Sequence, residues 1–250
     1  MSGHSKWAKI KHKKAVTDAK RGAAFTKIIR EITAAAKDGG GNTDHNPRLR
    51  TAISRAREIN MASSNIENAI KKGTGELPGI IYETVVFDAF GPGGVALLIE
   101  GLTDNKNRTT AEIRNILSKK NGSLAGAGST AWMFSKRGLI SVEKNKVGEE
   151  ELMGIALEAG AEDFSSEDAS YYEIICDPVN FENIKNAIQA KGIPMLIAEI
   201  TMIASSKVKV EGEQARQFVS LIEALEEHED VQSVSENSDI SEKDLEQSGQ

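Results

Sequence analysis

The chain of 250 residues has little of what a disulfide framework, a metal site or a membrane span requires. Cys176 is the only cysteine, so no internal disulfide can form and a reducing compartment is expected. The four histidines (His4, His12, His45 and His228) are scattered and show no metal-ligand spacing with Cys176. No apolar run approaches the roughly 20 residues that cross a bilayer. These absences predict a soluble protein of a reducing compartment, with no metal, no cofactor and no membrane partner.

Recognisable catalytic arrangements are absent as well. No histidine has a neighbouring residue that resembles a base and its orienting partner. Cys176 follows two isoleucines in an apolar strand, where a buried small hydrophobe is expected. The acid pairs Glu162-Asp163 and Glu167-Asp168 lie in predicted loops, where a solvated surface is the usual state. The sequence therefore predicts neither an enzyme nor a small-molecule substrate.

Charges of opposite sign are unevenly distributed along the chain. Residues 1–72 contain 16 Lys and Arg against 6 Asp and Glu, whereas residues 73–250 contain 15 against 31. The formal net charge of −6 conceals this division. Because a basic segment attracts phosphate backbones, we expect the N-terminal part to bind nucleic acid. The acidic remainder either faces another partner or keeps the protein away from its neighbours.

Residues 1–21 are predicted to be a flexible basic arm. Trp7, Ala8 and Ile10 keep neither a two-residue nor a 3.6-residue repeat, so no packed strand or amphipathic helix is expected there. The lysines of the arm neutralise phosphates and release counterions, and Trp7 is suited to stacking on a base. The alternative is a solvated terminus whose lysines serve only solubility.

Residues 22–78 are predicted to form a basic domain of three helices. The first helix begins near Thr17-Asp18 and ends at the glycines of residues 39–41. The second opens at Asn46-Pro47, a capping residue followed by proline. The third begins at Ser64, because Ser64–Glu67 has the spacing of a capping box, and ends at Lys71-Lys72-Gly73.

The arm and the three-helix domain together supply the predicted contacts to nucleic acid. An arm of lysines reads the phosphate backbone rather than the bases, so no target sequence is predicted. The predicted contact residues are Lys6, Trp7, Lys9, Lys11, His12, Lys13, Lys14, Lys20, Arg21, Lys27, Arg30, Arg48, Arg50, Lys71 and Lys72.

Residues 79–135 and 206–236 are predicted to form one middle α/β domain. Strands at 82–89 and 95–100 flank Gly91–Gly94, which is turn chemistry and lacks the spacing of a phosphate-binding loop. A helix follows Thr103-Asp104, a good pair of capping residues, and a third strand is expected at 130–134. The weak strand at 207–210, the helix at 213–228 and the strand at 231–234 complete this domain.

Residues 137–204 are predicted to be an acidic domain inserted into the middle one. Their strands and helices follow the order β-α-β-β-α-β of the ferredoxin-like motif, and residues 138–203 carry 4 basic against 13 acidic side chains. A basic protein is therefore a candidate partner for this surface. The fold class is α+β: a three-helix domain followed by two ferredoxin-like-type α/β domains, the third inserted into the second. Residues 237–250 are expected to be a disordered acidic tail.

The stretch Thr103–Thr109 offers a second candidate contact for an anion. Capping by Thr103 or Asp104 explains those two residues, but it does not explain a cation in the first turn of a helix, where the helix dipole disfavours it. Backbone N–H groups joined by Asn105, Asn107 and Arg108 would form an anion site. A phosphate or an acidic partner is the predicted ligand, and a simple helix cap is the alternative.

Several blocks of the sequence together resemble the YebC/PmpR family. They are 2–7, 10–14, 18–22, 46–50, 65–75, 91–95 and 103–109. The resemblance implies a cytoplasmic bacterial protein of three domains, described as a probable transcriptional regulator that binds DNA, without established catalytic residues. It also implies the alternative of a ribosome-associated or rRNA-associated translation factor, because mitochondrial relatives act as translational activators.

The chain departs from the family pattern at two places. Ala62 stands where a proline usually precedes the third helix, and Asp88-Ala89-Phe90 replaces the usual Glu-Gly-Tyr. We predict a nucleic-acid-binding regulator of gene expression, with DNA and ribosomal RNA as competing targets that no sequence feature separates. A protein-interaction module is the lesser alternative, since it leaves the basic N-terminal part unexplained.

Overall fold

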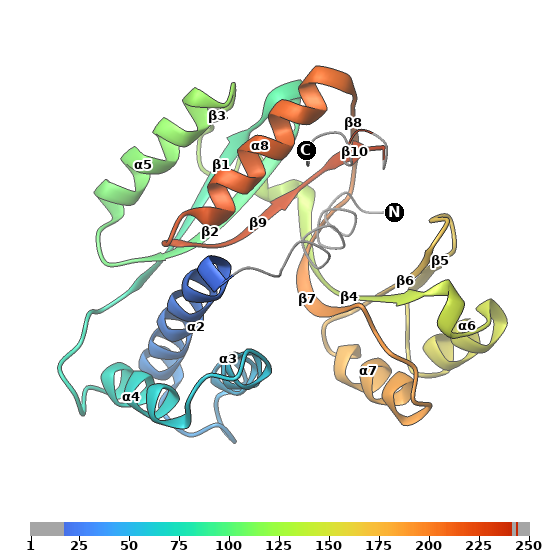
Figure 1. The fold of residues 1–250 in the computed structure, drawn as a ribbon, viewed down its shortest axis with the longest axis horizontal. Helices are drawn as coiled ribbons and strands as arrows, with labels where there is room; N and C mark the ends of the chain where they lie inside the picture. The colour runs from blue at the N-terminus through green and yellow to red at the C-terminus, as the bar shows by residue number, and fades with distance from the viewer. Residues whose placement is uncertain (1–17, 242–243, 245–250) are drawn as a thin grey trace.

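The structure, a computed structural model, describes residues 18–241 and residue 244. Three parts are visible in Figure 1: a helical part, a middle sheet with two helices, and a second sheet with two helices. The middle sheet takes strands from both sides of the third part in sequence. The predicted α+β class, with the third part inserted into the second, is confirmed.

The helical part consists of α2 (Asp18–Gly39), α3 (Pro47–Glu58) and α4 (Ser63–Thr74), with α3 and α4 packed on α2. Its core is small and rich in alanine around Ile32 and Leu49, both fully buried. Gly73 allows the close approach of α4 to α2, because a Cβ there would lie 2.4 Å from the Thr33 carbonyl oxygen. The predicted capping box is wrong: Ala62 is the N-cap of α4 and no side chain caps that helix.

Asn46 holds the connection between α2 and α3. Its Oδ1 accepts a bond from Leu49 N at 3.0 Å, as predicted for a helix cap. Its amide also donates to the carbonyl oxygens of Ala35 at 2.7 Å and Gly40 at 2.8 Å. One buried side chain therefore both begins α3 and ends α2.

The middle sheet has the order β3-β1-β2-β9 and is antiparallel throughout. Its strands are β1 (Glu83–Phe90), β2 (Ala96–Thr103), β3 (Ser123–Leu124) and β9 (Val231–Glu236). The short helix η1 (Pro92–Gly94) forms the turn between β1 and β2. Helices α5 (Lys106–Lys119) and α8 (Gly212–Glu227) bury their apolar sides against one face of this sheet.

The predicted strand at 130–134 is wrong. Residues Ala131–Met133 form the 3-10 helix η2, and the third strand of the sheet is β3, which begins at Ser123 instead of Thr130. The cause is Asp88 in β1, whose carboxylate accepts bonds from the backbone N–H groups of Thr130 and Ala131, each at 2.8 Å. Those groups are therefore unavailable to a strand partner.

The third part has the sheet order β5-β6-β4-β7, all antiparallel. Its elements are β4 (Phe134–Glu143), η3 (Lys144–Lys146), α6 (Glu149–Glu158), β5 (Asp163–Ser165), β6 (Tyr171–Cys176), α7 (Phe181–Ala190) and β7 (Ile197–Ala204). Both helices pack on one face. The predicted β-α-β-β-α-β unit is thus present, and Phe134 and Met202 join it to the middle sheet at Ala96 and Leu98.

The expectation that every residue after 236 is disordered is also wrong. Ser238–Ile240 form β10, which pairs in parallel with β8 (Val208–Val210). Asn237 is 2% exposed, and its Oδ1 accepts a bond from Ala96 N at 2.8 Å. Residues 237–240 are therefore anchored, in part through a buried amide, a polar group that composition alone does not distinguish from a solvated one.

We expect Asn46→Ala to destabilise the helical part by about 2–4 kcal/mol. The variant loses a helix cap, worth about 1 kcal/mol, and leaves two buried carbonyl oxygens without their donor. Hydrogen exchange of α3 amides measures this locally, which matters because a protein of several parts does not unfold in one step. Asn68→Ala, on the exposed side of α4, is the matched control. Equal exchange rates in the two variants would contradict the role of Asn46.

Candidate nucleic-acid interface

The predicted arm contacts lie at the edge of what the structure describes. Lys6, Trp7, Lys9, Lys11, His12, Lys13 and Lys14 are outside the described residues. Lys20 and Arg21 belong to the first turn of α2, for which only the backbone is described. Their proposed contacts to nucleic acid therefore rest on charge and sequence.

A group of exposed cations lies on the helical part. Arg50, Lys71 and Lys72 were predicted and are exposed, and none of them forms an ion pair with another described residue. Three further cations outside the predicted contacts, Lys37, Arg55 and Arg57, are also exposed and form no ion pair with another described residue. Several of these cations lie in the last turns of α3 and α4, where they also stabilise the helix dipole.

Arg48 is engaged within the helical part. Its guanidinium donates to Glu31 at 2.8 Å and to Asp38 at 2.8 Å. The hydrogen bond to Glu31 raises the pKa of Arg48, so its charge is permanent but already balanced. A phosphate would have to compete with two carboxylates, which makes Arg48 a weaker contact than its position in the sequence suggests.

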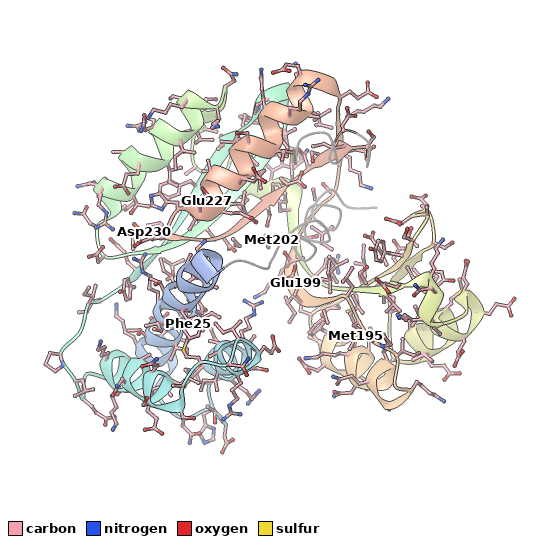
Figure 2. The ribbon with its side chains drawn as sticks, in the orientation of Figure 1. Phe25, Met195, Glu199, Met202, Glu227 and Asp230 are labelled. Atoms are coloured by element: carbon pink, nitrogen blue, oxygen red, sulfur yellow. The ribbon has the colours of Figure 1, made fainter. Side chains whose placement is uncertain are left out.

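Lys27 and Arg30 attach α2 to the middle sheet. The Lys27 Nζ donates to the Glu226 carbonyl oxygen at 2.6 Å, where α8 ends. Arg30 forms ion pairs with Asp230 and Glu229, and its guanidinium lies 5.5 Å from the centre of the Tyr82 ring. Figure 2 shows Glu227 and Asp230 at the end of α8 that faces α2. These two cations are structural in this arrangement.

Asp230 is the centre of this attachment. Its side chain is 3% exposed and receives Arg30 from α2 and Arg108 Nη2 from α5 at 2.9 Å. The Thr109 hydroxyl donates to the same carboxylate at 2.6 Å. Burial alone would raise the pKa of Asp230, but the bonds from Thr109, Arg108 and Arg30 lower it to about 2.

Backbone contacts hold the loop that carries Asp230 close against β2. Leu102 N donates to the Asp230 carbonyl oxygen at 2.8 Å. A Cβ on Gly101 would lie 2.7 Å from that oxygen, so only glycine fits in β2 at this point. Asp230 N donates to His228 Nδ1 at 3.1 Å, and His228 Nε2 therefore carries the hydrogen that faces Glu112 Oε2 at 2.9 Å.

The prediction that Thr103 or Asp104 caps α5 is wrong. Asn105 is the N-cap, and its Oδ1 accepts a bond from Arg108 N at 3.1 Å. Arg108 occupies the first turn because carboxylates surround it: Asp104 and Asp230 lie 2.9 Å away and Glu112 lies 3.9 Å away. These acids counteract the unfavourable helix dipole.

An open cleft of about 460 Å³ adjoins this cluster, lined in part by Ile80, Tyr82 and Glu227. Ligand atoms of Glu112, His228 and Asp230 lie within 4.8 Å of one another. The Asp230 carboxylate is nevertheless occupied by two guanidiniums and a hydroxyl, and both His228 nitrogens have partners. Ion pairs and hydrogen bonds therefore account for the cluster of Glu112, His228 and Asp230 without a metal ion.

Comparison with known proteins identifies the family. The model for the TACO1/YebC protein N-terminal domain matches residues 5–76, and the model for the TACO1/YebC second and third domain matches residues 82–238. The chain belongs to the TACO1/YebC family. The resemblance to the YebC/PmpR family is thereby confirmed.

Relatives of similar length share about half of the residues. A "Probable transcriptional regulatory protein" of Prosthecochloris aestuarii is 52% identical over 242 residues, covering 97% of both chains. One of Natranaerobius thermophilus with the same name is 51% identical over 243 residues, covering 96% of this chain and 97% of its own. A conserved hypothetical protein from Aquifex aeolicus has a similar crystal structure, with a TM-score of 0.80, 42% identity and 91% and 94% coverage.

The names of these TACO1/YebC relatives describe regulatory proteins and no enzymatic activity. None of the helices among the described residues combines the length and the apolar composition that a membrane crossing requires.

We expect Asp230→Asn to lower the free energy of unfolding at pH 7 by about 2–5 kcal/mol, because Arg30, whose side chain is 11% exposed, loses its buried charged partner. The pKa of Asp230 is about 2, below the ordinary 3.8. The unfolded chain therefore binds the proton first as pH falls. The contribution of Asp230 is complete above about pH 5 and is lost as pH falls through 3.8 towards 2.

Denaturation measured from pH 7 to pH 2.5 tests this dependence. Asp104→Asn is the matched control, since Asp104 meets the same Arg108 from an exposed position and should contribute less than about 1 kcal/mol. The interpretation fails if the two variants lose stability in parallel as pH falls.

Proposed function

We propose that this protein is a cytoplasmic DNA-binding regulator of transcription that holds its target mainly through the basic arm. The observation that carries the proposal is the uneven charge, with 16 Lys and Arg against 6 Asp and Glu in residues 1–72. The names of the relatives, probable transcriptional regulatory proteins, support transcription as the process.

The geometry narrows the proposed interface. Lys27, Arg30 and Arg48 are engaged with groups of the protein itself. In addition to the arm, the exposed cations of the helical part are available to phosphates: Arg50, Arg55, Arg57, Lys71 and Lys72. Phosphates held by the arm and by the ends of α3 and α4 would orient the duplex, while the acidic third part keeps away from it.

The proposed interface does not include the predicted anion contact at Asn105, Asn107 and Arg108. Three carboxylates lie within 3.9 Å of the Arg108 guanidinium, so the local field is acidic. A phosphate approaching α5 would meet the negative charges of the cleft before it met the backbone N–H groups.

The first test measures the salt dependence of duplex binding. If about six phosphates are neutralised, the logarithm of affinity falls against the logarithm of salt concentration with a slope of about −5. We expect replacement of Lys11, Lys13 and Lys14 by alanine in the full chain to reduce that slope by about 3. The matched control replaces Lys191, Lys207 and Lys209, which are exposed in the acidic half. Equal slopes in both triple variants would refute binding through the arm.

The second test separates DNA from RNA as the target. The full chain is titrated with a labelled DNA duplex and challenged with equal concentrations of unlabelled duplex DNA or structured ribosomal RNA. A transcription regulator should prefer the duplex by tenfold or more, which corresponds to about 1.4 kcal/mol. Stronger competition by ribosomal RNA would replace the proposal with the translation-factor alternative.

A further inference from the structure

Trp132 is an exposed aromatic ring on the middle part, far in sequence from the basic arm. Its side chain is 75% exposed, the highest value for an aromatic residue in the described part of the chain. The indole Nε1–H donates to the Ser129 carbonyl oxygen at 3.0 Å. This bond holds the ring in one orientation and satisfies its polar group, so exposure of Trp132 is not needed to hydrate it.

Hydrogen bonds to a buried carboxylate hold the backbone of the loop that carries Trp132. Asp88, only 5% exposed, accepts bonds from the backbone N–H groups of Gly128 at 3.0 Å and of Thr130 and Ala131 at 2.8 Å. Burial alone would raise the pKa of the Asp88 carboxyl, but these bonds lower it. Ala131 and Met133 pack on Ala96 and Leu98 of β2. Because the loop and the ring are already ordered, a ligand that binds Trp132 causes little further loss of conformational entropy.

The charge around this loop differs from the rest of the acidic half. Residues 113–142 contain five Lys or Arg and no Asp or Glu. Lys136, four residues after Trp132, is exposed and forms no ion pair with another described residue. Four residues of extended chain span at most about 14 Å, so Lys136 can reach a phosphate next to a base on Trp132.

The surroundings of the ring favour a nucleobase over a protein surface. Gly126, Ala127, Gly128 and Ser129 are exposed, small and uncharged. They form no apolar patch of the kind that protein partners bury, and they let a sugar-phosphate chain approach closely. A base stacks on an indole only when its face is free, which requires an unpaired strand.

We propose that Trp132 stacks an unpaired base of a single-stranded nucleic acid, with Lys136 meeting a neighbouring phosphate. This inference rests on the proposed nucleic-acid function and adds a second contact, on a different part of the molecule and with a different form of the target. It gives the exposed ring a role that neither packing nor helix capping supplies.

The test uses the full chain with Trp7→Phe, so that Trp132 is the only remaining tryptophan of the two. Titration with a twelve-nucleotide oligouridylate or oligothymidylate should quench its fluorescence. Trp132→Ala should weaken binding about five- to hundredfold, and Trp132→Phe should weaken it less, because a phenyl ring still stacks. Leu157→Ala, which removes another exposed apolar side chain, is the matched control and should leave affinity unchanged.

Four outcomes overturn the inference. Affinity for single strands that is the same in Trp132→Ala and the parent excludes stacking, and so does saturation without quenching. A parent that binds duplex but no single strand removes the Trp132 contact and leaves the arm-based function standing. A parent that binds neither form overturns both proposals.

Discussion

A buried carboxylate shared by two guanidiniums determines how the parts of this molecule are arranged. Asp230 lies in the loop between α8 and β9, and it joins Arg30 of α2 to Arg108 of α5. A charge that is 3% exposed is tolerable only when it is paired and fully hydrogen-bonded, and these partners meet that condition. The helical part is thereby held to the end of the middle sheet.

Local pattern predicted most of the secondary structure. The predicted helix at 213–228 is found as α8 (Gly212–Glu227), because its apolar residues repeat clearly along one side. The predictions failed where a side chain formed a hydrogen bond with the backbone that the sequence pattern does not reveal. Asp88 bonds the residues that resembled a strand, and Thr103 Oγ1 accepts from Asn105 N instead of capping α5.

The candidate site was less predictable than the fold, for a physical reason. Arg30 and Arg50 both lie in helices of the basic segment, so the sequence does not distinguish them. In the structure Arg30 forms an ion pair with Asp230, two hundred residues away, whereas Arg50 is exposed. Composition gives the number of cations and not the number that remain free. Trp132 was missed because a strand was predicted there, in which every second side chain would be buried.

The insertion of the third part into the middle one constrains the order in which the chain can fold. β2 pairs with β9, which follows the whole of residues 137–204 in sequence. A chain emerging from the ribosome therefore carries β1 and β2 with an open edge while the third part is being made. The third part holds all of its own strands and can close first. The middle sheet closes after the third part, and the same segment delivers Asp230, so docking of the N-terminal helices waits until residue 230 has been made.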